Sequence, residues 1–381
     1  MSHNPIVSVE VFPVRLPTRA VLHLARGAVS DASGAPHVFV RIRDAAGITG
    51  WGECRPSPRW SDETEETVVS TLRTYLAPAI VGRDPFDLAG LHAALDAVIA
   101  PGLTRGQPIA KSAIDLAAHD LVGQRLGIDL PSLFGRASAE RLPLCWTVSA
   151  DNPADAEART REGYAAGYRG FKVKLGVRPE LDVEIVETVR AIAPTAYLWA
   201  DANQAYDVGT ALRRARSLAR LGVDVFEQPT PARDYDALRR LRSAGSLPIA
   251  VDEGIFSSQN LLQLLKLDAI DVLVVKVCKV GGLWHARRLL DLAEEAGVPI
   301  LGSSLTESGL AVAAMAKLFG CYNLAGPADL NGPQMLQAAP GVPPWTVNEG
   351  SLVIPAGPGI GIQPNLAALT WNSEPRNQET E

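Results

Sequence analysis

Two lysines stand two residues apart in a short apolar stretch, residues 170–175. In a β-strand, residues i and i+2 project from the same face, so Lys172 and Lys174 would lie side by side. Close packing of like charges lowers the pKa of an amine, and an amine lowered toward neutrality can remove a proton from carbon. The pair therefore predicts carboxylates elsewhere in the chain that face these two lysines.

Three carboxylates and a further lysine stand at corresponding places later in the chain. Each ends a short apolar run of the kind that forms a buried strand. A single acid there could instead cap the next helix, and an isolated Lys-x-Lys pair could be a solvated strand edge. The repetition of charged residues at the same end of five consecutive strands favours one shared site. Besides the lysine pair, these residues are Asp201, Glu227, Asp252 and Lys276.

The three carboxylates predict a metal ion. Carboxylates from adjacent strands cannot crowd together without a positive partner. Asp201, Glu227 and Asp252 offer only oxygen ligands, with no histidine or cysteine among them. Such a set favours Mg²⁺ over zinc, and Mn²⁺ could replace it. A carboxylate substrate bound to this metal would have its α-proton acidified, because the metal stabilises the enediolate that forms.

The lysines predict acid/base chemistry. Lys174 comes from the second strand of the repeating region and Lys276 from the sixth, so they would flank opposite faces of a substrate. One would remove the proton and the other would return it on the far side. Asn203 is either a turn residue or a donor beside the metal, and Glu253 is either a ligand or a partner of one. Lys279 is expected to pair at the surface.

These residues need a scaffold that brings strand ends together. From residue 142, short β-branched runs alternate with helical stretches, which predicts a parallel sheet with right-handed crossovers. Eight strands and seven helices predict an α/β fold, a modified TIM barrel of (β/α)7β type over residues 136–331. The predicted strands cover residues 142–148, 170–174, 197–201, 225–227, 249–252, 272–276, 299–302 and 322–325, and the helices cover 154–166, 180–193, 208–221, 235–243, 257–265, 284–296 and 308–318.

The preceding residues, 1–135, have a different pattern. Alternating apolar and polar runs, two of them joined by a turn, predict an antiparallel sheet, and helical periodicity follows. Strands followed by helices indicate an N-terminal α+β domain. The C-terminal segment 332–371, much of it rich in proline and glycine, is expected to return to this domain. The predicted strands cover 6–16, 37–43 and 48–53, and the predicted helices cover 63–76, 89–100 and 110–126.

Composition excludes several classes of protein. The chain has 381 residues, is 47% hydrophobic and 20% charged, and carries a net charge of −6 without a basic block. A nucleic-acid partner is therefore not expected. No apolar run approaches the roughly 20 residues that span a bilayer, and no export signal is visible at the start. The four cysteines are scattered, as in a reducing compartment. A cytoplasmic enzyme without a membrane partner is expected.

The sequence resembles the enolase superfamily, and within it the muconate-lactonizing subgroup of the mandelate racemase/muconate lactonizing enzyme family. The resemblance extends over nearly the whole chain, and the motifs occur in the family's order. The N-terminal domain resembles the family's capping domain. The matching motifs are Gly50-Trp-Gly-Glu53 and residues 112–120, followed by 170–174, 201–203, 226–229, 251–253 and 275–282.

The resemblance implies a role for each strand-end residue. Lys172 would hold the substrate carboxylate and tune Lys174 as the base. Glu307 lies where the family places a carboxylate near the substrate. No histidine follows the seventh strand, which argues against the mandelate-racemase branch. The implied metal ligands are Asp201, Glu227 and Asp252, the implied catalytic residues are Lys172, Lys174 and Lys276, and the expected substrate-binding residues are Asn203, Glu307 and Asp329.

Several substrates are compatible with the resemblance. The subgroup includes muconate cycloisomerases, dehydratases that form succinylbenzoate, dipeptide epimerases and racemases of N-substituted amino acids. Dipeptide epimerases carry an Asp-x-Asp motif after strand eight that holds the substrate ammonium. Asp329 followed by Asn331 is half of that motif. Asp329 therefore either binds a cationic nitrogen or is a turn residue.

Two loops of the capping domain, residues 18–33 and part of 58–63, are expected to set specificity. His23 and Arg26 in the first loop either meet a polar group of the substrate or lie in a solvated loop. The favoured hypothesis is an Mg²⁺-dependent racemase or epimerase of an amino-acid derivative of N-acyl, dipeptide or betaine type. The alternatives are a muconate cycloisomerase, a syn-dehydratase and a non-catalytic binding barrel. The resemblance also implies a homo-oligomer that binds a small-molecule carboxylate.

Overall fold

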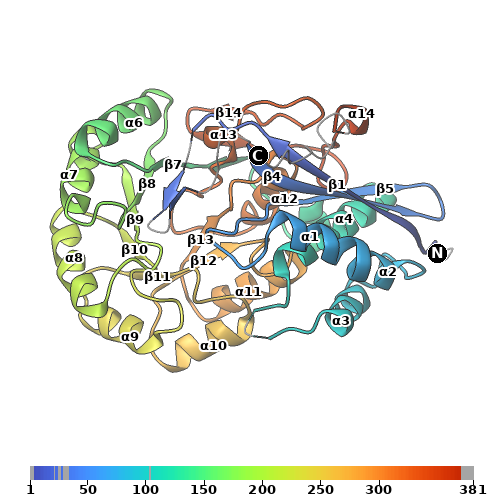
Figure 1. Ribbon diagram of the computed structural model, residues 1–381, viewed down its shortest axis with the longest axis horizontal. Helices are drawn as coiled ribbons and strands as arrows, with labels where there is room; N and C mark the ends of the chain where they lie inside the picture. Colours follow the sequence, from blue (N-terminus) through green and yellow to red (C-terminus); the bar gives the residue numbers. More distant parts are fainter. Residues whose placement is uncertain (1–3, 21, 25–26, 29–33, 103, 370–381) are drawn as a thin grey trace, which may run out of the picture.

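The computed structural model describes residues 4–20, 22–24, 27–28, 34–102 and 104–369. Seven parallel strands form one sheet in the order β13-β12-β11-β10-β9-β8-β7, and a helix follows each strand (Figure 1). This arrangement confirms the predicted α/β barrel class. The strands are β7 Cys145–Val148, β8 Gly170–Lys174, β9 Tyr197–Asp201, β10 Val225–Glu227, β11 Ile249–Val251, β12 Val272–Lys276 and β13 Ile300–Ser303.

The barrel helices follow the strands in an arc along the outside of the sheet (Figure 1). Polar side chains begin four of them by accepting a backbone N–H of the first turn, as N-caps do. The capping residues are Asn152, Asp207, Asp234 and Ser257. The helices are α6 Pro153–Ala165, α7 Asp182–Ile192, α8 Val208–Arg220, α9 Tyr235–Ser243, α10 Ser258–Lys266, α11 Leu283–Glu295 and α12 Gly309–Phe319.

The eighth strand was predicted wrongly. Residues 322–325 are not a strand, and single bridges at Ala328 and Asp329 close the barrel instead. Ala328 N–H donates to the Pro143 carbonyl (2.8 Å), and Asp329 N–H donates to the Gly302 carbonyl (2.9 Å). Pro327 has no N–H for a ladder, so this segment cannot form a regular central strand. The closure nevertheless places Asp329 beside the end of β13.

The N-terminal domain packs an antiparallel sheet, ordered β1-β4-β5, against helices on one of its faces (Figure 1). This confirms the expected separate domain with an antiparallel sheet. The predicted helix at 63–76 is a short α-helix that continues as a π-helix and a further turn. The elements are β1 Ile6–Leu16, β4 Ala35–Asp44, β5 Thr49–Cys54, α1 Glu65–Thr71, η1 Leu72–Leu76, α2 Ala77–Ile80, α3 Leu88–Val98, α4 Pro108–Leu126 and α5 Leu130–Phe134.

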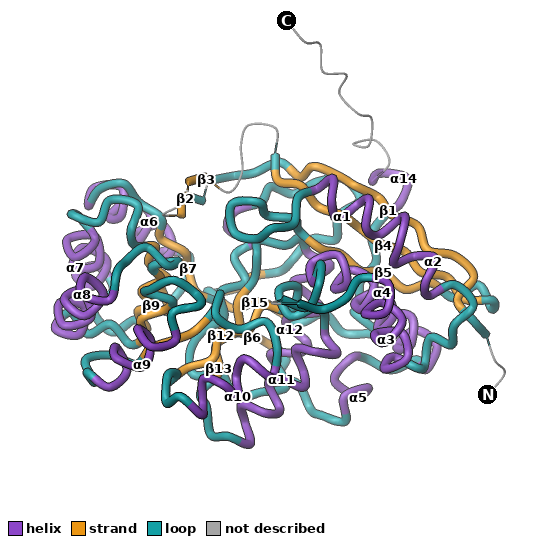
Figure 2. Tube along the Cα trace, turned by 60° about the horizontal axis from the view of Figure 1, so that its bottom comes forward, coloured by secondary structure: helices purple, strands orange, loops and turns teal. Residues whose placement is uncertain are grey.

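Short elements connect this domain to the barrel. The hairpin of β2 His23–Leu24 and β3 Gly27–Ala28 lies above β7 in Figure 2. The backbone of His23 donates a hydrogen bond to the Ser149 hydroxyl and accepts one from it. No helix in the described ranges is long and apolar enough to cross a membrane. The remaining elements are β6 Arg141–Pro143, α13 Gly332–Met335, β14 Val347–Asn348, β15 Ser351–Val353 and α14 Leu366–Leu369.

Two glycines in β5 allow the strand to pack against α4 without side chains between them. A Cβ on Gly52 would lie 2.1 Å from the Ala113 carbonyl oxygen, and a Cβ on Gly50 would lie 2.2 Å from the Ala117 carbonyl oxygen. Both obstacles are backbone atoms of a buried helix, which cannot move aside as a flexible side chain could. The close approach of β5 to α4 therefore requires glycine at both positions.

We expect Gly52→Ala to destabilise the protein by about 3 kcal/mol, because the added methyl group overpacks the contact between β5 and α4. Gly102→Ala is the matched control, since among the described residues no atom outside its chain neighbours lies within 4 Å of the place its Cβ would take. We expect that control to stay within about 0.5 kcal/mol of the wild type. Urea unfolding measures both values. Equal stability of the two variants would contradict the packing argument.

Candidate active site

The strand ends bring four lysines and five carboxylates into one buried cluster. Every member is at most 7% exposed. Buried charges persist only when they are paired, so each lysine must answer specific carboxylates. The structure thus assembles all six strand-end residues that the sequence singled out. The cluster consists of Lys172, Lys174, Lys276, Lys279, Asp201, Glu227, Asp252, Glu253 and Asp329.

Lys172 lies at the centre of the cluster and faces three carboxylates. Its Nζ is 2.8 Å from Glu227 Oε2, 3.0 Å from Asp329 Oδ2 and 3.1 Å from Asp201 Oδ2. Burial alone would lower the pKa of Lys172, but these anions outweigh it and raise the pKa well above its ordinary range. Lys172 therefore stays charged at neutral pH. Because Lys172 is paired with three carboxylates and does not line the pocket described below, it supplies a fixed positive charge and does not exchange a proton with a substrate.

Lys174 points to the open side of the cluster. Its Nζ donates to Asp201 Oδ2 (2.6 Å) and to Asn203 Oδ1 (3.2 Å). The Asn203 side chain also donates to Glu253 Oε1 (3.1 Å), so it connects Lys174 with the next carboxylate. Asn203 has a left-handed backbone, with φ of 41°, which asparagine tolerates better than most residues. The structure thus favours the interpretation of Asn203 as a donor inside the site.

Lys276, the last residue of β12, and Lys279, in the turn that follows, share Asp252. Lys276 Nζ donates to Asp252 Oδ2, and Lys279 Nζ donates to Asp252 Oδ1 and to its carbonyl oxygen, both at 2.6 Å. The prediction that Lys279 pairs at the surface is wrong. The turn after β12 folds Lys279 back beneath Asp252, where it is completely buried. Burial lowers the pKa of Asp252's partner Lys279, whereas the nearby carboxylates raise the pKa of Lys276 despite its burial.

The carboxylates fit a divalent cation. One oxygen from each of Glu227, Asp252 and Glu253 lies within 4.8 Å of the other two. Neither oxygen of Glu227 accepts a hydrogen bond from the described part of the chain, although the side chain is completely buried. Burial and the neighbouring Asp201 raise the pKa of Glu227 well above its ordinary value. Lys172 is the ion-pair partner of Glu227, and a hard cation would add a second positive partner. A donor set of oxygens alone suits Mg²⁺.

The trio differs from the predicted ligand set in one member. Asp201 was expected as the third ligand, but Glu253 completes the trio in this structure. Asp201 faces Lys172 and Lys174, which hold its pKa below the usual range even though burial acts in the opposite direction. Asp201 remains beside the trio, since Lys172 contacts both Asp201 and Glu227. The structure therefore leaves Glu253 as a candidate ligand along with the three predicted ones.

Above the cluster lies a narrow pocket whose wall is formed by residues of both the barrel and the N-terminal domain. Lys174 and Lys276 both line it, so the two proposed acid/base groups reach the same space. The capping domain contributes an aromatic wall, because the Trp60 ring lies 4.4 Å from Lys276 Nζ in a cation–π contact. The lining residues are Leu22, Leu24, Arg55, Ser57, Trp60, Lys174, Lys276, Ser304, Leu305, Thr306, Asp329 and Asn331.

Two expected substrate-binding residues are engaged within the protein. Asp329 lines the pocket, but its carboxylate pairs with Lys172 and accepts hydrogen bonds from Thr147 Oγ1 and Ser303 Oγ, both at 3.1 Å. Glu307 is not among the pocket-lining residues. Its carboxylate accepts hydrogen bonds from Cys278 Sγ (2.9 Å) and Leu305 N–H (2.6 Å). Neither carboxylate is free to meet a substrate in this structure.

Sequence reasoning missed several residues that form the pocket wall. Trp60 lies in the loop at 58–63 that was expected to set specificity, so that range was the available signal. No sequence signal marked Arg55 or Leu305 as pocket residues. Arg55 follows β5 and Leu305 follows β13, and only the fold brings these two segments together. Leu22 and Leu24 come from the other expected specificity loop. Arg26 lies outside the described residues.

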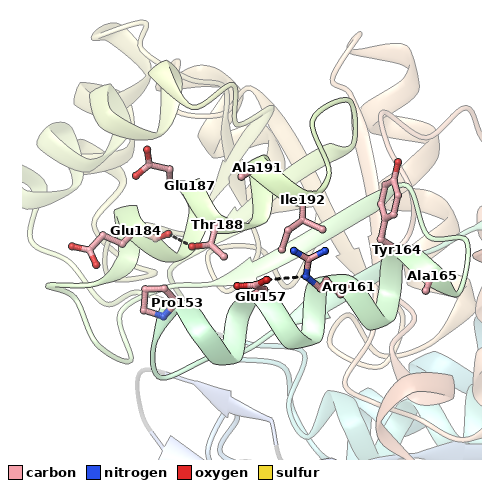
Figure 3. A pocket seen from close by; sticks show the side chains of 10 residues that line it. All are labelled: Pro153, Glu157, Arg161, Tyr164, Ala165, Glu184, Glu187, Thr188, Ala191 and Ile192. Atoms are coloured by element: carbon pink, nitrogen blue, oxygen red, sulfur yellow. Dashed lines mark hydrogen bonds and ion pairs between the residues drawn. The ribbon is translucent and has the colours of Figure 1, made fainter.

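A wide groove on the outside of the barrel is unrelated to this chemistry. It runs between α6 and α7 and is lined by charged and small side chains, among them Glu157, Arg161 and Glu187 (Figure 3). Glu157 and Arg161 pair with each other one helical turn apart, as exposed helix residues commonly do. No member of the buried cluster lines this groove. The candidate active site is therefore the smaller pocket at the carboxyl ends of the strands.

Fold and site define an α/β barrel whose strand ends carry a buried cluster of lysines and carboxylates that could hold a divalent cation. Residues 6–135 match the family described as "Mandelate racemase / muconate lactonizing enzyme, N-terminal domain", and residues 155–368 match the family described as "Enolase C-terminal domain-like". The chain belongs to the mandelate racemase/muconate lactonizing enzyme family of the enolase superfamily. It is an isomerase of that superfamily, as are the relatives described next.

Three relatives illustrate the range of reactions. The N-succinyl-L-Arg/Lys racemase of Bacillus cereus is 31% identical over 96% of this chain and 96% of that protein. The structure of 2-chloromuconate cycloisomerase from Rhodococcus opacus 1CP superimposes with a TM-score of 0.91, at 31% identity over 97% of this chain and 100% of that one. A dipeptide epimerase from Cytophaga hutchinsonii, complexed with Mg and D-Ala-L-Val, gives a TM-score of 0.88 at 28% identity over 96% and 98%.

Proposed function

We propose that this protein is an Mg²⁺-dependent racemase or epimerase of an N-acylated amino acid. The observation that carries the proposal is that Lys174 and Lys276 line one pocket. They come from strands β8 and β12, which lie four places apart in the sheet order. Two amines that reach the same space from different strands can exchange a proton on either face of one carbon.

In the proposed mechanism, one lysine in its neutral form accepts the α-proton and the other, as an ammonium, donates a proton to the opposite face. Asp201 orients Lys174 and Asp252 orients Lys276 through their ion pairs. Lys172 keeps its charge and attracts the substrate carboxylate. When bound by Asp201, Glu227 and Asp252, with Glu253 beside them, Mg²⁺ would stabilise the negative charge that develops on that carboxylate. The pocket walls exclude water from the reacting carbon.

The engagement of Asp329 supports an acylated nitrogen over a free ammonium. Three donors already satisfy the Asp329 carboxylate, and the residue two places on, Asn331, is neutral. A free ammonium would therefore find no unpaired carboxylate at this position and would lie near two cationic lysines. An amide nitrogen is neutral and avoids that repulsion. Among amino-acid derivatives, N-acyl compounds fit this pocket better than free dipeptides or betaines.

A substrate panel tests this proposal. We expect the enzyme with Mg²⁺ to racemise at least one N-acyl-amino acid and to leave the corresponding free amino acid and N-terminally free dipeptide unchanged. Chiral chromatography of each L-isomer after incubation measures the reaction. Preferential turnover of the N-terminally free dipeptides would contradict the assignment of Asp329 as an internal partner.

A muconate cycloisomerase is the second candidate. It is supported by the apolar part of the pocket wall, formed by Leu22, Leu24 and Leu305, which would suit a diene without a nitrogen. That reaction needs only one lysine to protonate carbon, so the second lysine in the pocket is its weaker point. Loss of the ultraviolet absorbance of muconate measures the reaction. Activity there, with none on amino-acid derivatives, would reverse the ranking of the two functions.

The proposal includes the organisation of the chain. Residues 1–135 would form the capping domain, residues 136–331 the catalytic barrel, and residues 332–371 a segment that returns to the cap. Ile360 N–H donates to Asp120 Oδ1 (2.8 Å), and Gly359 bridges to Asp129, which supports that return. We also propose a cytoplasmic homo-oligomer. Size-exclusion chromatography with light scattering would then give a mass at least twice that of one chain.

A further inference from the structure

We infer that Glu307 is a positioning residue that ties the loop after Lys276 to the pocket wall formed by residues 304–306. This inference rests on the proposed function, because it concerns the acid/base role of Lys276. Glu307 is 1% exposed and does not line the pocket, so it would act through other residues. The hydrogen bonds of its carboxylate, and of the residues around it, identify what it positions.

Glu307 joins two segments that are far apart in the sequence. One carboxylate oxygen accepts the Cys278 thiol, two residues after Lys276, and the other accepts the Leu305 N–H. The distances are 2.9 Å and 2.6 Å. Since Lys276 and Leu305 both line the pocket, the carboxylate connects two walls of the same space from behind. Both oxygens are used by these donors, which explains why a buried carboxylate is tolerated here.

The Leu305 peptide is held on its other side by the capping domain. The buried guanidinium of Arg55 donates to the Leu305 carbonyl at 2.5 Å. The next residue, Thr306, has a φ of 69°, a left-handed conformation that is unfavourable for a β-branched side chain. Such a backbone persists only when its surroundings fix it. Glu307 and Arg55 fix the two ends of the Leu305 residue and thereby hold Thr306 in the pocket wall.

A second carboxylate, Glu53 from the capping domain, holds the same loop at Ser308, one residue after Glu307. Glu53 accepts Ser308 N–H (2.8 Å), Ser308 Oγ (2.6 Å) and Ala311 N–H (3.0 Å). It therefore caps α12, which has no side-chain cap of its own. His37, behind Glu53, lies 2.7 Å from its Oε1 through Nδ1. Residues 304–308 are thus held from the cap at both ends, and Glu307 passes that constraint to the Lys276 loop.

The contacts of Glu307 constrain the segment that carries Lys276 and not the one that carries Lys174. The side chain of Lys276 precedes Cys278 by two residues, whereas Lys174 is held by Asp201 and Asn203, which Glu307 does not contact. Asp252 holds the Lys276 ammonium, but the Cys278 bond holds the backbone that follows Lys276. Loss of the Glu307 carboxylate should therefore shift Lys276 and leave Lys174 in place. In a racemase the two lysines act on opposite enantiomers. The effect of Glu307 must then fall mainly on the enantiomer whose α-proton Lys276 exchanges.

Exchange of the α-proton with D₂O, measured by NMR for each enantiomer of an N-acyl-amino acid, tests this directly. The Lys276→Ala variant identifies which enantiomer depends on Lys276. A misplacement of about 1 Å can cost about 100-fold, so Glu307→Ala should slow exchange of that enantiomer about 100-fold and the other by less than about threefold. Glu307→Gln should restore most of the rate, because its carbonyl can accept Leu305 N–H and its amide can donate to the Cys278 sulfur.

Asp120→Ala is the matched control, since Asp120 is a buried carboxylate that accepts two backbone N–H groups away from the pocket. It should slow both enantiomers equally if it has any effect. An equal loss for both enantiomers in Glu307→Ala would overturn the inference. Absence of exchange from either enantiomer by the wild type would instead overturn the proposed function.

Backbone amide exchange decides the inference even if the proposed substrates are wrong. In Glu307→Ala, hydrogen–deuterium exchange measured by mass spectrometry should accelerate in two peptides, one covering residues 304–308 and one covering residues 277–281. Asp120→Ala should leave both peptides at the wild-type rate. Acceleration in the first peptide alone would mean that Glu307 does not couple the Lys276 loop to the pocket wall, and would overturn the inference.

Discussion

Lys276→Ala and Lys174→Ala are each expected to abolish racemisation while preserving α-proton exchange for one enantiomer. The two variants should preserve opposite enantiomers, because each retains the lysine on one face of the substrate. Loss of a general acid or base typically lowers a rate by about 10² to 10⁴-fold. Chiral chromatography measures racemisation, and NMR in D₂O measures exchange for each enantiomer.

Both variants should fold, since neither leaves a buried carboxylate without a cation. Asp252 keeps Lys279 when Lys276 is removed, and Asp201 keeps Lys172 when Lys174 is removed. Lys317→Ala is the control, because Lys317 is another buried lysine, bound to the Gly357 and Gly359 carbonyl oxygens. It should retain racemisation. Loss of exchange for the same enantiomer in both active-site variants would contradict the opposed arrangement of the lysines.

Removal of divalent metal with EDTA is expected to stop turnover, and added Mg²⁺ should restore it. A metal that stabilises an oxyanion contributes several kcal/mol, which corresponds to a fall of about 10³-fold or more. Glu227→Gln should have a similar effect even with Mg²⁺ present, because the Glu227 oxygens accept no hydrogen bond from the described residues and are the best placed to bind a cation.

Thermal unfolding separates metal binding from catalysis. A ligand at about 100 times its Kd stabilises the folded state by about 2.7 kcal/mol, so Mg²⁺ should raise the Tm of the wild type. Glu227→Gln should lose most of this rise, whereas the control Glu187→Gln, in the outer groove, should keep it. An equal Mg²⁺-dependent rise in all three proteins would contradict the placement of the cation at Glu227.

The strand-end cluster could be predicted from the sequence because its geometry follows from the fold class. Once parallel strands alternate with helices, their carboxyl ends must meet, and every charged residue there must face the others. Lys174, Asp201 and Glu227 were therefore placed in one site by their positions alone. The barrel helices were also predictable, since amphipathic periodicity and N-caps such as Asp234 mark their limits locally.

The remaining features depend on contacts that no local pattern encodes. Lys279 was expected at the surface, because nothing in its neighbours indicates that the turn folds it beneath Asp252. Strand eight was misplaced, because the apolar run before Gly326 resembles a strand while closure occurs after Pro327. Asp329 and Glu307 were recognised as acids near the site, but their partners Lys172 and Cys278 became evident only in three dimensions.

Incorporation of solvent deuterium by the wild-type enzyme with Mg²⁺ is the most direct measurement of the central claim, which is proton exchange at an α-carbon by opposed lysines. Starting from one pure enantiomer of an N-acyl-amino acid in D₂O, NMR should find deuterium at the α-carbon of the product enantiomer from the earliest turnovers. A product enantiomer that retains its original α-hydrogen, or an α-position that never exchanges in any carboxylate tested, would contradict the account.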